Sequence, residues 1–179
     1  LERSASIYHR IMPGGQDTPL INDGFASFQQ DRIYGLSYEI DLTSPPRYAP
    51  DGNFADRAAR RIRNLAFQGR PVRDEDQFVL ATNSFRSGGA GHYVSGDRAG
   101  IVLETRLLSR DMLVRFIQQT GEVAPPQPQG WCFASMAPDT SVTFDSAPLA
   151  TGCLDDPLSP KVEPLGMTPT GFRRFRLRL

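Results

Sequence analysis

Large apolar residues alternate with polar residues in several short stretches of the chain. In residues 36–42, the clearest case, every second residue is large and apolar and the residues between are polar. This alternation is typical of a strand with one buried face. Residues 77–83 have a continuous apolar centre, which predicts a strand buried on both faces. Further short strands are expected at residues 60–68, 100–106, 131–135, 140–145 and 172–179.

Two segments have helical periodicity instead. Residues 1–11 have the pattern of the end of a helix, which the Pro-Gly-Gly sequence at residues 13–15 breaks. Ser109 is expected to cap a second helix that ends at Gly121. Its apolar residues predict a buried stripe made of Met112, Leu113, Phe116 and Ile117. Because helices and strands mix without regular βαβ alternation, we predict an α+β fold with a mixed, largely antiparallel sheet and a few packed helices.

The charge balance bears on the kind of partner. The chain has 179 residues, with 20 basic and 20 acidic side chains and a formal net charge of zero. A protein that neutralises the many phosphates of a nucleic-acid polymer usually has a basic excess. We therefore expect no nucleic-acid polymer as a partner, whereas a small nucleotide is compatible with this balance. No apolar stretch reaches the roughly 18 residues of a membrane-spanning helix, so no membrane span is expected.

The first residues predict that the chain is part of a longer protein. The chain begins with Leu1, inside the first expected helix, and has no initiator Met. We interpret it as truncated on its N-terminal side. The proline-rich spacer at residues 125–128 is too short to separate two domains, so residues 1–179 are expected to form one domain.

Three polar features have ordinary structural interpretations. Cys132 and Cys153 lack metal-knuckle spacing; they would form a disulfide in an oxidising compartment or stay two buried thiols in the cytosol, and the sequence favours neither. Asp155 and Asp156 are interpreted as a solvated turn. In the last expected strand, apolar residues alternate with three arginines. We interpret these as a solvated face, the alternative being a phosphate-facing stripe: Arg174, Arg176 and Arg178.

The sequence offers no recognisable catalytic centre. The two histidines, His9 and His92, are far apart, and neither a His-Glu-x-x-His nor a Gly-x-Ser-x-Gly pattern occurs. No cluster of Asp, Asn and His has the spacing of a two-metal site. We therefore expect this chain to bind a ligand, to hold no metal or cofactor, and to be inactive by itself.

The strongest candidate for a binding site is the segment of residues 81–93. The aromatic ring of Phe85 offers a surface on which a base can stack. The amide of Asn83 can donate and accept hydrogen bonds, and Arg86 could reach a phosphate. Three glycines allow close backbone approach to a ligand: Gly88, Gly89 and Gly91. In the alternative interpretation, the glycines only shape a turn and Phe85 belongs to the core.

Three motifs in this region resemble those of a known family. Residues 81–89, Ala-Thr-Asn-Ser-Phe-Arg-Ser-Gly-Gly, resemble the Ala-Thr-Asn-Asn-(Tyr/Phe)-Arg-Ala-x-Gly-Gly loop of the 5′-nucleotidase C-terminal domain family. Residues 35–48 and 61–72 are similar to the stretches that precede this loop in the branch of the 2′,3′-cyclic-nucleotide 2′-phosphodiesterases/3′-nucleotidases. The resemblance is strongest over residues 20–93 and is looser in the later half.

The resemblance implies a function for the chain as part of a larger enzyme. Residues 1–179 would be the nucleotide-binding C-terminal domain of a hydrolase that converts 2′,3′-cyclic and 3′-nucleotides to nucleoside and phosphate. A separate N-terminal domain, absent from this chain, would hold two divalent metal ions and perform the hydrolysis. The parent protein would be located in the periplasm or cell envelope.

The resemblance also implies the residues that contact the ligand. Phe85 matches one of two aromatic rings that clamp the base, and the other ring would lie upstream of this chain. Asn83 matches a position beside the base. Ala90 stands where many family members have an aspartate, and whether His92 replaces that ribose contact stays open. The full predicted set is Asn83, Phe85, Arg86, Ser87, Gly88, Gly89 and His92.

Two alternatives remain. The chain could belong to a 5′-nucleotidase or UDP-sugar hydrolase, against which the Tyr-Glu-Ile-Asp-Leu-Thr-Ser-Pro-Pro-Arg-Tyr stretch at residues 38–48 argues, because it is typical of the cyclic-phosphodiesterase branch. It could also be a binding or interaction module without an enzymatic partner. The N-terminal sequence of the parent protein would separate these alternatives by containing or lacking a metal-binding domain.

Overall fold

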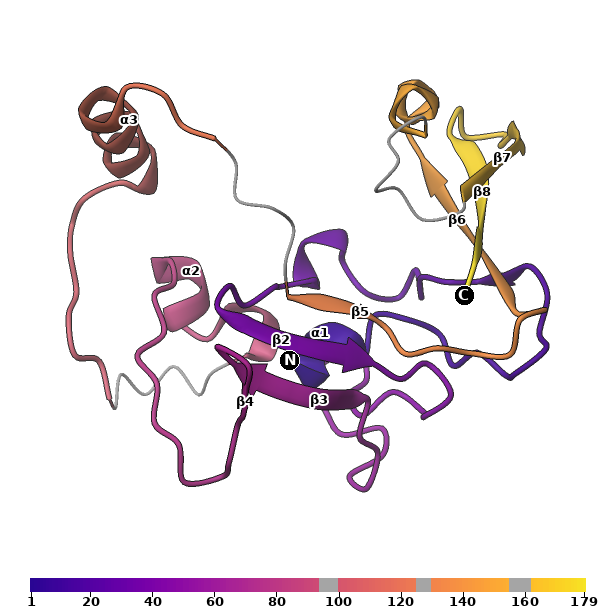
Figure 1. Cartoon of the computed structure of the whole chain (residues 1–179), viewed down its shortest axis with the longest axis horizontal. Coiled ribbons are helices and arrows are strands. Elements are labelled where there is room, and N and C mark those ends of the chain that lie inside the picture. Colours follow the sequence, from indigo (N-terminus) through magenta and orange to yellow (C-terminus); the bar gives the residue numbers. More distant parts are fainter. Residues whose placement is uncertain (94–99, 125–129, 155–161) are drawn as a thin grey trace. The chain divides into compact units, whose positions relative to one another are not determined.

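A computed structural model of the chain describes residues 1–93, 100–124, 130–154 and 162–179 (Figure 1). The chain divides into two compact units. Unit 1 consists of Leu1–Pro71 and Gly130–Leu179, and unit 2 of Val72–Gln129. The proline-rich spacer and the Asp155-Asp156 pair lie outside the described residues.

A four-stranded mixed sheet in unit 1 has the strand order β4-β3-β2-β5 (Figure 1). Strand β2 (Leu36–Ile40) pairs antiparallel with β3 (Ile62–Phe67) and parallel with β5 (Trp131–Phe133). Strand β4 (Arg70–Pro71) continues the sheet beyond β3. The strands expected at residues 36–42, 60–68 and 131–135 are therefore confirmed, with somewhat shorter bounds.

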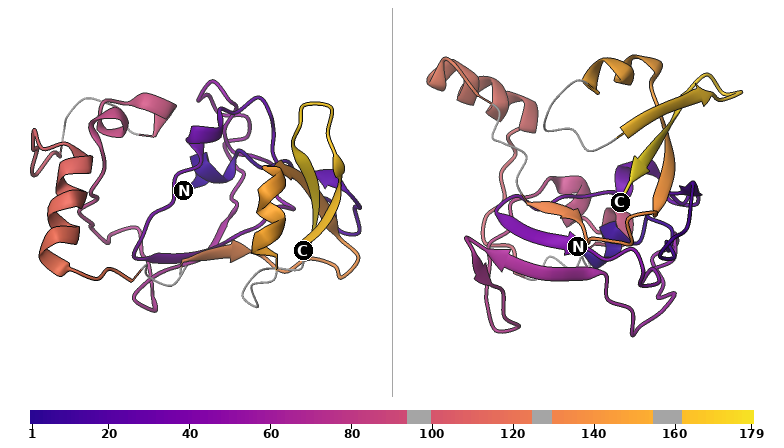
Figure 2. Two further views of the ribbon diagram at one scale, coloured as in Figure 1. Left: turned by 90° about the horizontal axis from the view of Figure 1, so that it is seen from above. Right: turned by 45° about the vertical axis from the view of Figure 1, so that its right-hand side comes forward.

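A second four-stranded sheet of unit 1 has the order β1-β6-β8-β7. Strand β1 (Thr18–Pro19) is parallel to β6 (Ser141–Ser146), whereas β8 (Arg173–Arg178) is antiparallel to both β6 and β7 (Val162–Met167). The paired ribbons of β7 and β8 are visible in both views of Figure 2. The strands expected near residues 140–145 and 172–179 are confirmed. With two mixed, largely antiparallel sheets and few helices, the α+β prediction is also confirmed.

The core of unit 1 combines residues from the N-terminal segment and both sheets. The first helix, α1 (Glu2–Ala5), is much shorter than residues 1–11, because the chain turns after Ser6 and Tyr8 forms an isolated bridge with Ile21. Of the apolar residues that produce the helical pattern, Ala5, Tyr8 and Ile11 are nevertheless buried, and Leu1 is partly buried. The buried cluster consists of Ala5, Ile7, Tyr8, Ile11, Leu20, Phe25, Tyr38, Ile40, Leu42, Val142 and Leu177.

A fully buried arginine, Arg61, connects α1 to the first sheet. Its Nε donates to the carbonyl of Ser44 at 2.9 Å, and its Nη1 donates to the carbonyls of Ala5 and Tyr8 at 2.8 and 2.7 Å. Burial lowers the pKa of this guanidinium to about 10, so it is still charged at neutral pH. Its hydrogen bonds to these carbonyls offset part of the free-energy cost of removing the charged guanidinium from water.

Unit 2 contains α2 (Ser84–Ser87), the short 3₁₀ helix η2 (Ala90–His92) and α3 (Ser109–Thr120). The helix expected from Ser109 to Gly121 is confirmed, and Gly121 ends it with a positive φ of 77°. Its cap position is Leu108, without a side-chain hydrogen bond, so the prediction of a Ser109 cap is wrong.

Three burial and strand predictions in unit 2 are also wrong. Residues 77–83 and 100–106 have no regular secondary structure and form no ladder with any described strand, and both segments are exposed. A strand needs a neighbour for its backbone groups, and local sequence does not supply one. Periodicity identifies an apolar face but not a layer that covers it. The apolar stripe of α3 is accordingly exposed and consists of Met112, Leu113, Phe116 and Ile117.

Among the described residues, no helix is long and apolar enough to cross a membrane.

Candidate functional site

The segment predicted to bind a ligand begins with a capped helical turn in unit 2. Asn83 is the N-cap of α2, with extended backbone angles (φ −89°, ψ 166°). Its side-chain oxygen accepts a hydrogen bond from the backbone N–H of Arg86 at 2.9 Å, and its carbonyl accepts from the N–H of Ser87 at 3.0 Å. A cap of this kind satisfies an otherwise unpaired N–H and fixes the first turn. That turn presents Phe85.

Phe85 has 54% of its surface exposed, so the alternative in which it belongs to the core is wrong. The neighbouring Arg86 is only 8% exposed. Its guanidinium lies 5.3 Å from the Phe85 ring centre and 4.6 Å from that of Tyr93, and its Nη1 donates to the carbonyl of Ala90 at 3.2 Å. In this structure Arg86 therefore packs within the segment and supports the two rings.

Glycines allow the chain to fold back around Arg86. Gly89 and Gly91 have φ values of 91° and 79°, in the left-handed region that favours glycine. A Cβ on Gly91 would overlap Nη1 of Arg86 and lie 3.0 Å from the ring of Tyr93. Gly88 has an ordinary φ of −78°, but a Cβ there would lie 3.1 Å from the carbonyl oxygen of Ser84.

His92 also has a left-handed backbone, with a φ of 61°. Its N–H donates to the carbonyl of Gly89 at 3.1 Å and its side chain is exposed. A non-glycine residue in this region stores local strain, which is often found at functional sites. The hydroxyl of Ser87 donates to the carbonyl of Ser84 at 3.3 Å, within the segment. The exposed side chains of the segment thus include the ring of Phe85 and the imidazole of His92.

All seven predicted site residues lie on this one segment, which we call the 83–93 loop. The loop offers the exposed ring of Phe85 as a stacking surface and the exposed imidazole of His92. Among the described residues of the chain, no group of three or more His, Cys, Asp or Glu side chains could hold a metal ion. The arrangement therefore has the elements for binding a planar polar ligand.

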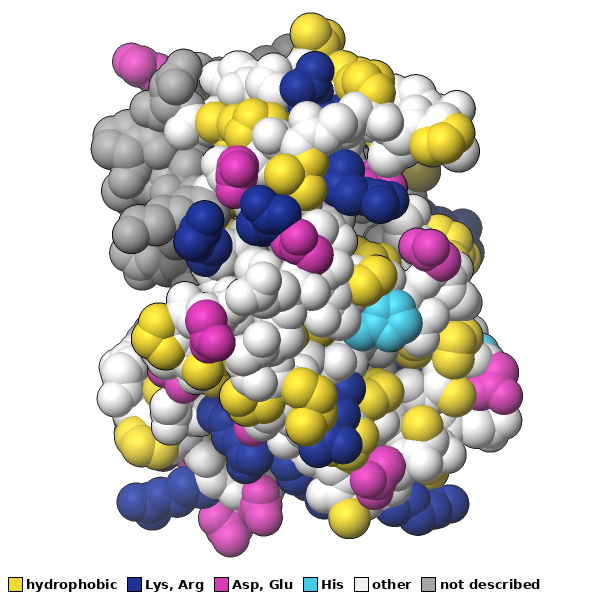
Figure 3. All heavy atoms as spheres, turned by 90° about the vertical axis from the view of Figure 1, so that its right-hand side faces the viewer, with side chains coloured by type: hydrophobic (Ala, Val, Ile, Leu, Met, Phe, Trp, Pro, Cys, Tyr) yellow, Lys and Arg dark blue, Asp and Glu magenta, His cyan; other side chains and the backbone are white. Residues whose placement is uncertain are grey.

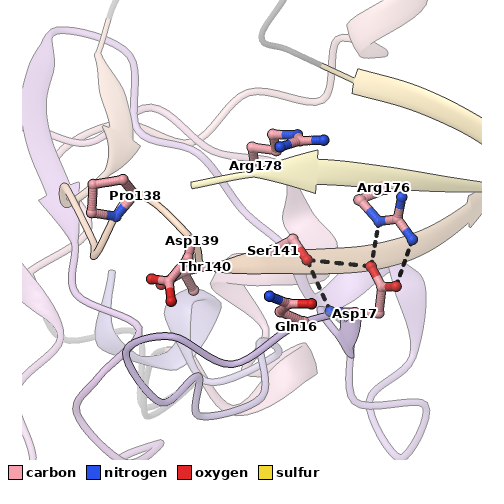
Figure 4. Close-up of a pocket in the computed structure, with 8 residues that line it drawn as sticks. All are labelled: Gln16, Asp17, Pro138, Asp139, Thr140, Ser141, Arg176 and Arg178. Carbon is pink, nitrogen blue, oxygen red and sulfur yellow. Dashed lines mark hydrogen bonds and ion pairs between the residues drawn. The ribbon is translucent and has the colours of Figure 1, made fainter.

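A separate polar pocket of about 280 Å³ lies in unit 1 (Figure 4). Within it, the guanidinium of Arg176 forms a two-pronged ion pair with the carboxylate of Asp17, with 2.6 Å between Nη2 and Oδ2. Arg176 also pairs with Glu163 at 3.0 Å, and Arg174 pairs with Asp145 at 2.8 Å. These ion pairs support the solvated-face interpretation of the arginine stripe. Sequence reasoning missed Asp17, because no local pattern links it to a strand at the other end of the chain.

A shallow groove crosses the first sheet of unit 1. Its lining residues are Ser37, Tyr38, Glu39, Asn64, Gly130, Trp131 and Cys132. Cys132 is a free thiol and is exposed, unlike the buried thiol of one of the two alternatives, and the side chain of Cys153 lies outside the described residues. On the molecular face shown in Figure 3, basic and acidic side chains are interspersed.

The fold and the loop define an α+β domain with a candidate ligand-binding loop. Residues 13–96 match the family model described as "5′-nucleotidase, C-terminal domain". The match covers β2, β3 and the whole 83–93 loop. This part of the chain therefore belongs to the 5′-nucleotidase C-terminal domain family, and the family prediction is confirmed.

Curated relatives share sequence beyond the matched range. The "Trifunctional nucleotide phosphoesterase protein YfkN" of Bacillus subtilis is 32% identical over 151 residues, which cover 84% of this chain and 10% of the relative. The "2′,3′-cyclic-nucleotide 2′-phosphodiesterase/3′-nucleotidase" of Salmonella typhimurium is 32% identical over 156 residues, which cover 83% of this chain and 24% of the relative. The protein of the same name from Yersinia enterocolitica is 27% identical over 189 residues, or 100% of this chain and 29% of the relative.

The chain thus spans 10% to 29% of the length of these relatives. No solved structure matches it significantly.

Proposed function

We propose that this chain is the substrate-recognition domain of a phosphoesterase that hydrolyses 2′,3′-cyclic and 3′-nucleotides to nucleoside and phosphate. The names of the relatives support the substrate class, and the motifs at residues 35–48 and 61–72 support the branch. The observation that carries the proposal is the exposed ring of Phe85 on a helical turn that Asn83 caps.

Recognition in this proposal depends on a rigid aromatic surface. Stacking of a base on an aromatic side chain contributes about 1–3 kcal/mol. The guanidinium of Arg86 contacts the carbonyl of Ala90 and the ring of Tyr93, and these contacts stabilise the conformation of the loop. The imidazole of His92 is then available to the ribose or phosphate, whereas the N–H groups of Gly88 and Gly89 already donate to the carbonyls of Ser84 and Arg86.

The proposal assigns the chemistry to another part of a longer protein. Two divalent metal ions in a preceding catalytic domain would supply Lewis-acid catalysis and an activated water for phosphoester hydrolysis. Binding energy from the base, remote from the reacting phosphorus, would position the phosphoester over these ions. We further propose that the parent protein acts in the periplasm or cell envelope, where extracellular nucleotides are available.

Binding is tested by titrating adenosine and 3′-AMP into the chain and following backbone amide shifts by NMR. We expect shifts centred on residues 83–93, with weak affinity because a single ring supplies only part of the stacking and desolvation. Phe85→Ala should abolish these shifts. Phe116→Ala is the matched control, since Phe116 is 52% exposed in the same unit and should leave the titration unchanged.

A blank titration is followed by a second one, with the upstream segment of the parent protein restored. A second blank would overturn the nucleotide-binding proposal and favour the interaction module. The branch is tested by assaying the parent protein on 2′,3′-cyclic AMP, 3′-AMP and 5′-AMP. Preference for 5′-AMP would contradict the assignment to the cyclic branch and support a 5′-nucleotidase.

A further inference from the structure

The connection between β2 and β3 in unit 1 contains a stacked aromatic pair. The rings of Tyr48 and Phe54 are stacked, with 4.9 Å between their centres and 27° between their planes. The same two residues form an isolated antiparallel bridge, which fixes the turn between them. Phe54 remains 41% exposed, so the pair presents apolar surface on a preorganised loop.

Two arginines lie against this pair, and a third shares hydrogen-bond acceptors with one of them. The guanidinium groups of Arg47 and Arg57 lie 5.3 and 4.2 Å from the centre of the Phe54 ring, within the range of cation–π interactions. Arg47 also donates to the carbonyls of Arg57 and Ala59 at 2.6 and 3.0 Å. Arg60 donates to the same two carbonyls at 2.9 and 2.8 Å. The side chains are therefore held in place by uncharged partners.

No carboxylate neutralises these three arginines among the described residues. Of the three aspartates in the connection, Asp41 pairs with Arg63, and the other two have hydrogen-bond donors nearby in the sequence. Asp51 accepts from the backbone N–H and the side-chain amide of Asn53, and Asp56 accepts from the N–H groups of Ala58 and Ala59. Four other arginines of unit 1 do have acidic partners. Their ion pairs are Arg63–Asp41, Arg174–Asp145, Arg176–Asp17, Arg176–Glu163 and Arg178–Glu163.

We propose that Arg47, Tyr48, Phe54, Arg57 and Arg60 form a docking surface for an acidic protein segment that carries an apolar side chain. The unneutralised guanidinium groups match carboxylates, which they can bind in two-pronged geometry. The exposed part of Phe54 matches an apolar side chain, which an inorganic anion would leave uncovered. Arginine and aromatic residues are also the side chains enriched at interface hot spots. This surface is independent of the proposed nucleotide-binding role.

The test uses the 179-residue chain and a library of short random peptides on a solid support. The labelled wild-type chain is compared with Arg57→Glu, Arg60→Gln and, as a matched control, Arg115→Glu, which changes an exposed arginine of α3. We expect the wild type to select peptides rich in Asp and Glu with a neighbouring apolar residue. Their affinity should fall about tenfold or more in Arg57→Glu, stay unchanged in Arg115→Glu, and decrease with added salt.

Three results would overturn the proposal. The first is a selected set without acidic enrichment, and the second is equal binding by wild type and Arg57→Glu. The third is displacement of the selected peptides by inorganic phosphate at equal concentration, which would indicate a small-anion site instead. Circular dichroism and thermal unfolding of each variant establish that it is folded, and Arg60→Gln gives a second, milder change if Arg57→Glu unfolds.

Discussion

Asp17 and Arg176 are 159 residues apart in the sequence, yet they form a two-pronged ion pair in unit 1 (Figure 4). The pair connects the loop before β1 to the strand β8. Ser141 on β6 completes the arrangement, because its hydroxyl donates to the Asp17 carboxylate at 3.3 Å and accepts from the N–H of Asp17 at 2.9 Å. Three distant segments therefore meet at one carboxylate.

This geometry predicts the titration of Asp17. Hydrogen bonds from Arg176 hold the pKa of the Asp17 carboxyl below its usual value of 3.8. A carboxyl with a lowered pKa in the folded state stabilises the fold above its unfolded pKa, and this contribution is lost as the pH falls through the folded value. NMR titration should find a low pKa for Asp17 in the wild type and a higher one in Arg176→Leu, where only the smaller effects of Ser141 and Arg178 still lower it. Asp145, which pairs with Arg174, should titrate alike in both proteins; an unchanged Asp17 would refute the assignment.

Gly91→Ala should loosen the 83–93 loop. The substitution adds a Cβ that overlaps the packed Arg86 and imposes a φ of 79° on a residue that disfavours it. We expect a local cost of about 1–3 kcal/mol. Faster amide hydrogen exchange across residues 83–93 would measure it. Gly121→Ala is the control, because Gly121 has a φ of 77° but no atom within 4 Å of its Cβ position. Equal effects of the two substitutions would show that the Arg86 contact is unimportant.

Gln68→Asn should stabilise the turn between β3 and β4. Phe67 pairs with Arg70, so Gln68 and Gly69 form a two-residue loop, with φ values of 51° and 78°. Positive φ at both positions is the geometry in which Asn-Gly is strongly preferred. A gain of about 0.5 kcal/mol is expected in denaturant unfolding. Gln68→Val, which is β-branched and resists this backbone, should have the opposite sign, and a stable valine variant would contradict the reasoning.

Arg61→Met should destabilise unit 1 strongly. The substitution removes the guanidinium donor from the carbonyls of Ala5, Tyr8 and Ser44, of which Ala5 keeps only a long hydrogen bond from the N–H of Tyr8 at 3.4 Å. We expect a loss of at least about 3 kcal/mol in the free energy of unfolding. Arg63→Met is the comparison, since Arg63 is half exposed and pairs with Asp41 at the surface; it should cost less than about 1 kcal/mol. Similar losses in the free energy of unfolding in the two variants would show that the buried hydrogen bonds of Arg61 do not stabilise unit 1 as proposed.

Strand positions could be predicted where alternation was regular. Tyr38 and Ile40 on β2 and Phe175 and Leu177 on β8 are buried as their spacing indicates. The strand β7 could not be predicted, because it contains a proline and a glycine that interrupt any alternation. Its pairing with β8 is a tertiary effect.

The candidate loop could be located from its residue types, but its internal contacts could not. Sequence reasoning assigned Arg86 to a phosphate, whereas the structure packs its guanidinium against Tyr93. That packing depends on the left-handed backbone at Gly89 and Gly91, which residue type allows but does not specify. The exposure of the α3 face was missed for a similar reason, since a covering layer is not encoded in local periodicity.

Unit 1 is discontinuous in sequence, because residues 72–129 interrupt it. Strand β2 cannot pair with β5, nor β1 with β6, until the ribosome has synthesised all of unit 2. Entropy of loop closure grows only logarithmically with the length of the interruption, so the finished fold tolerates it well. The disadvantage is kinetic. Strands β1 and β2 are synthesised before the strands that pair with them, so their backbone edges are unpaired at first, and pairing over such sequence distances is slow. During translation, the nascent chain should therefore be most prone to aggregation, and most dependent on chaperones, before its last strands emerge.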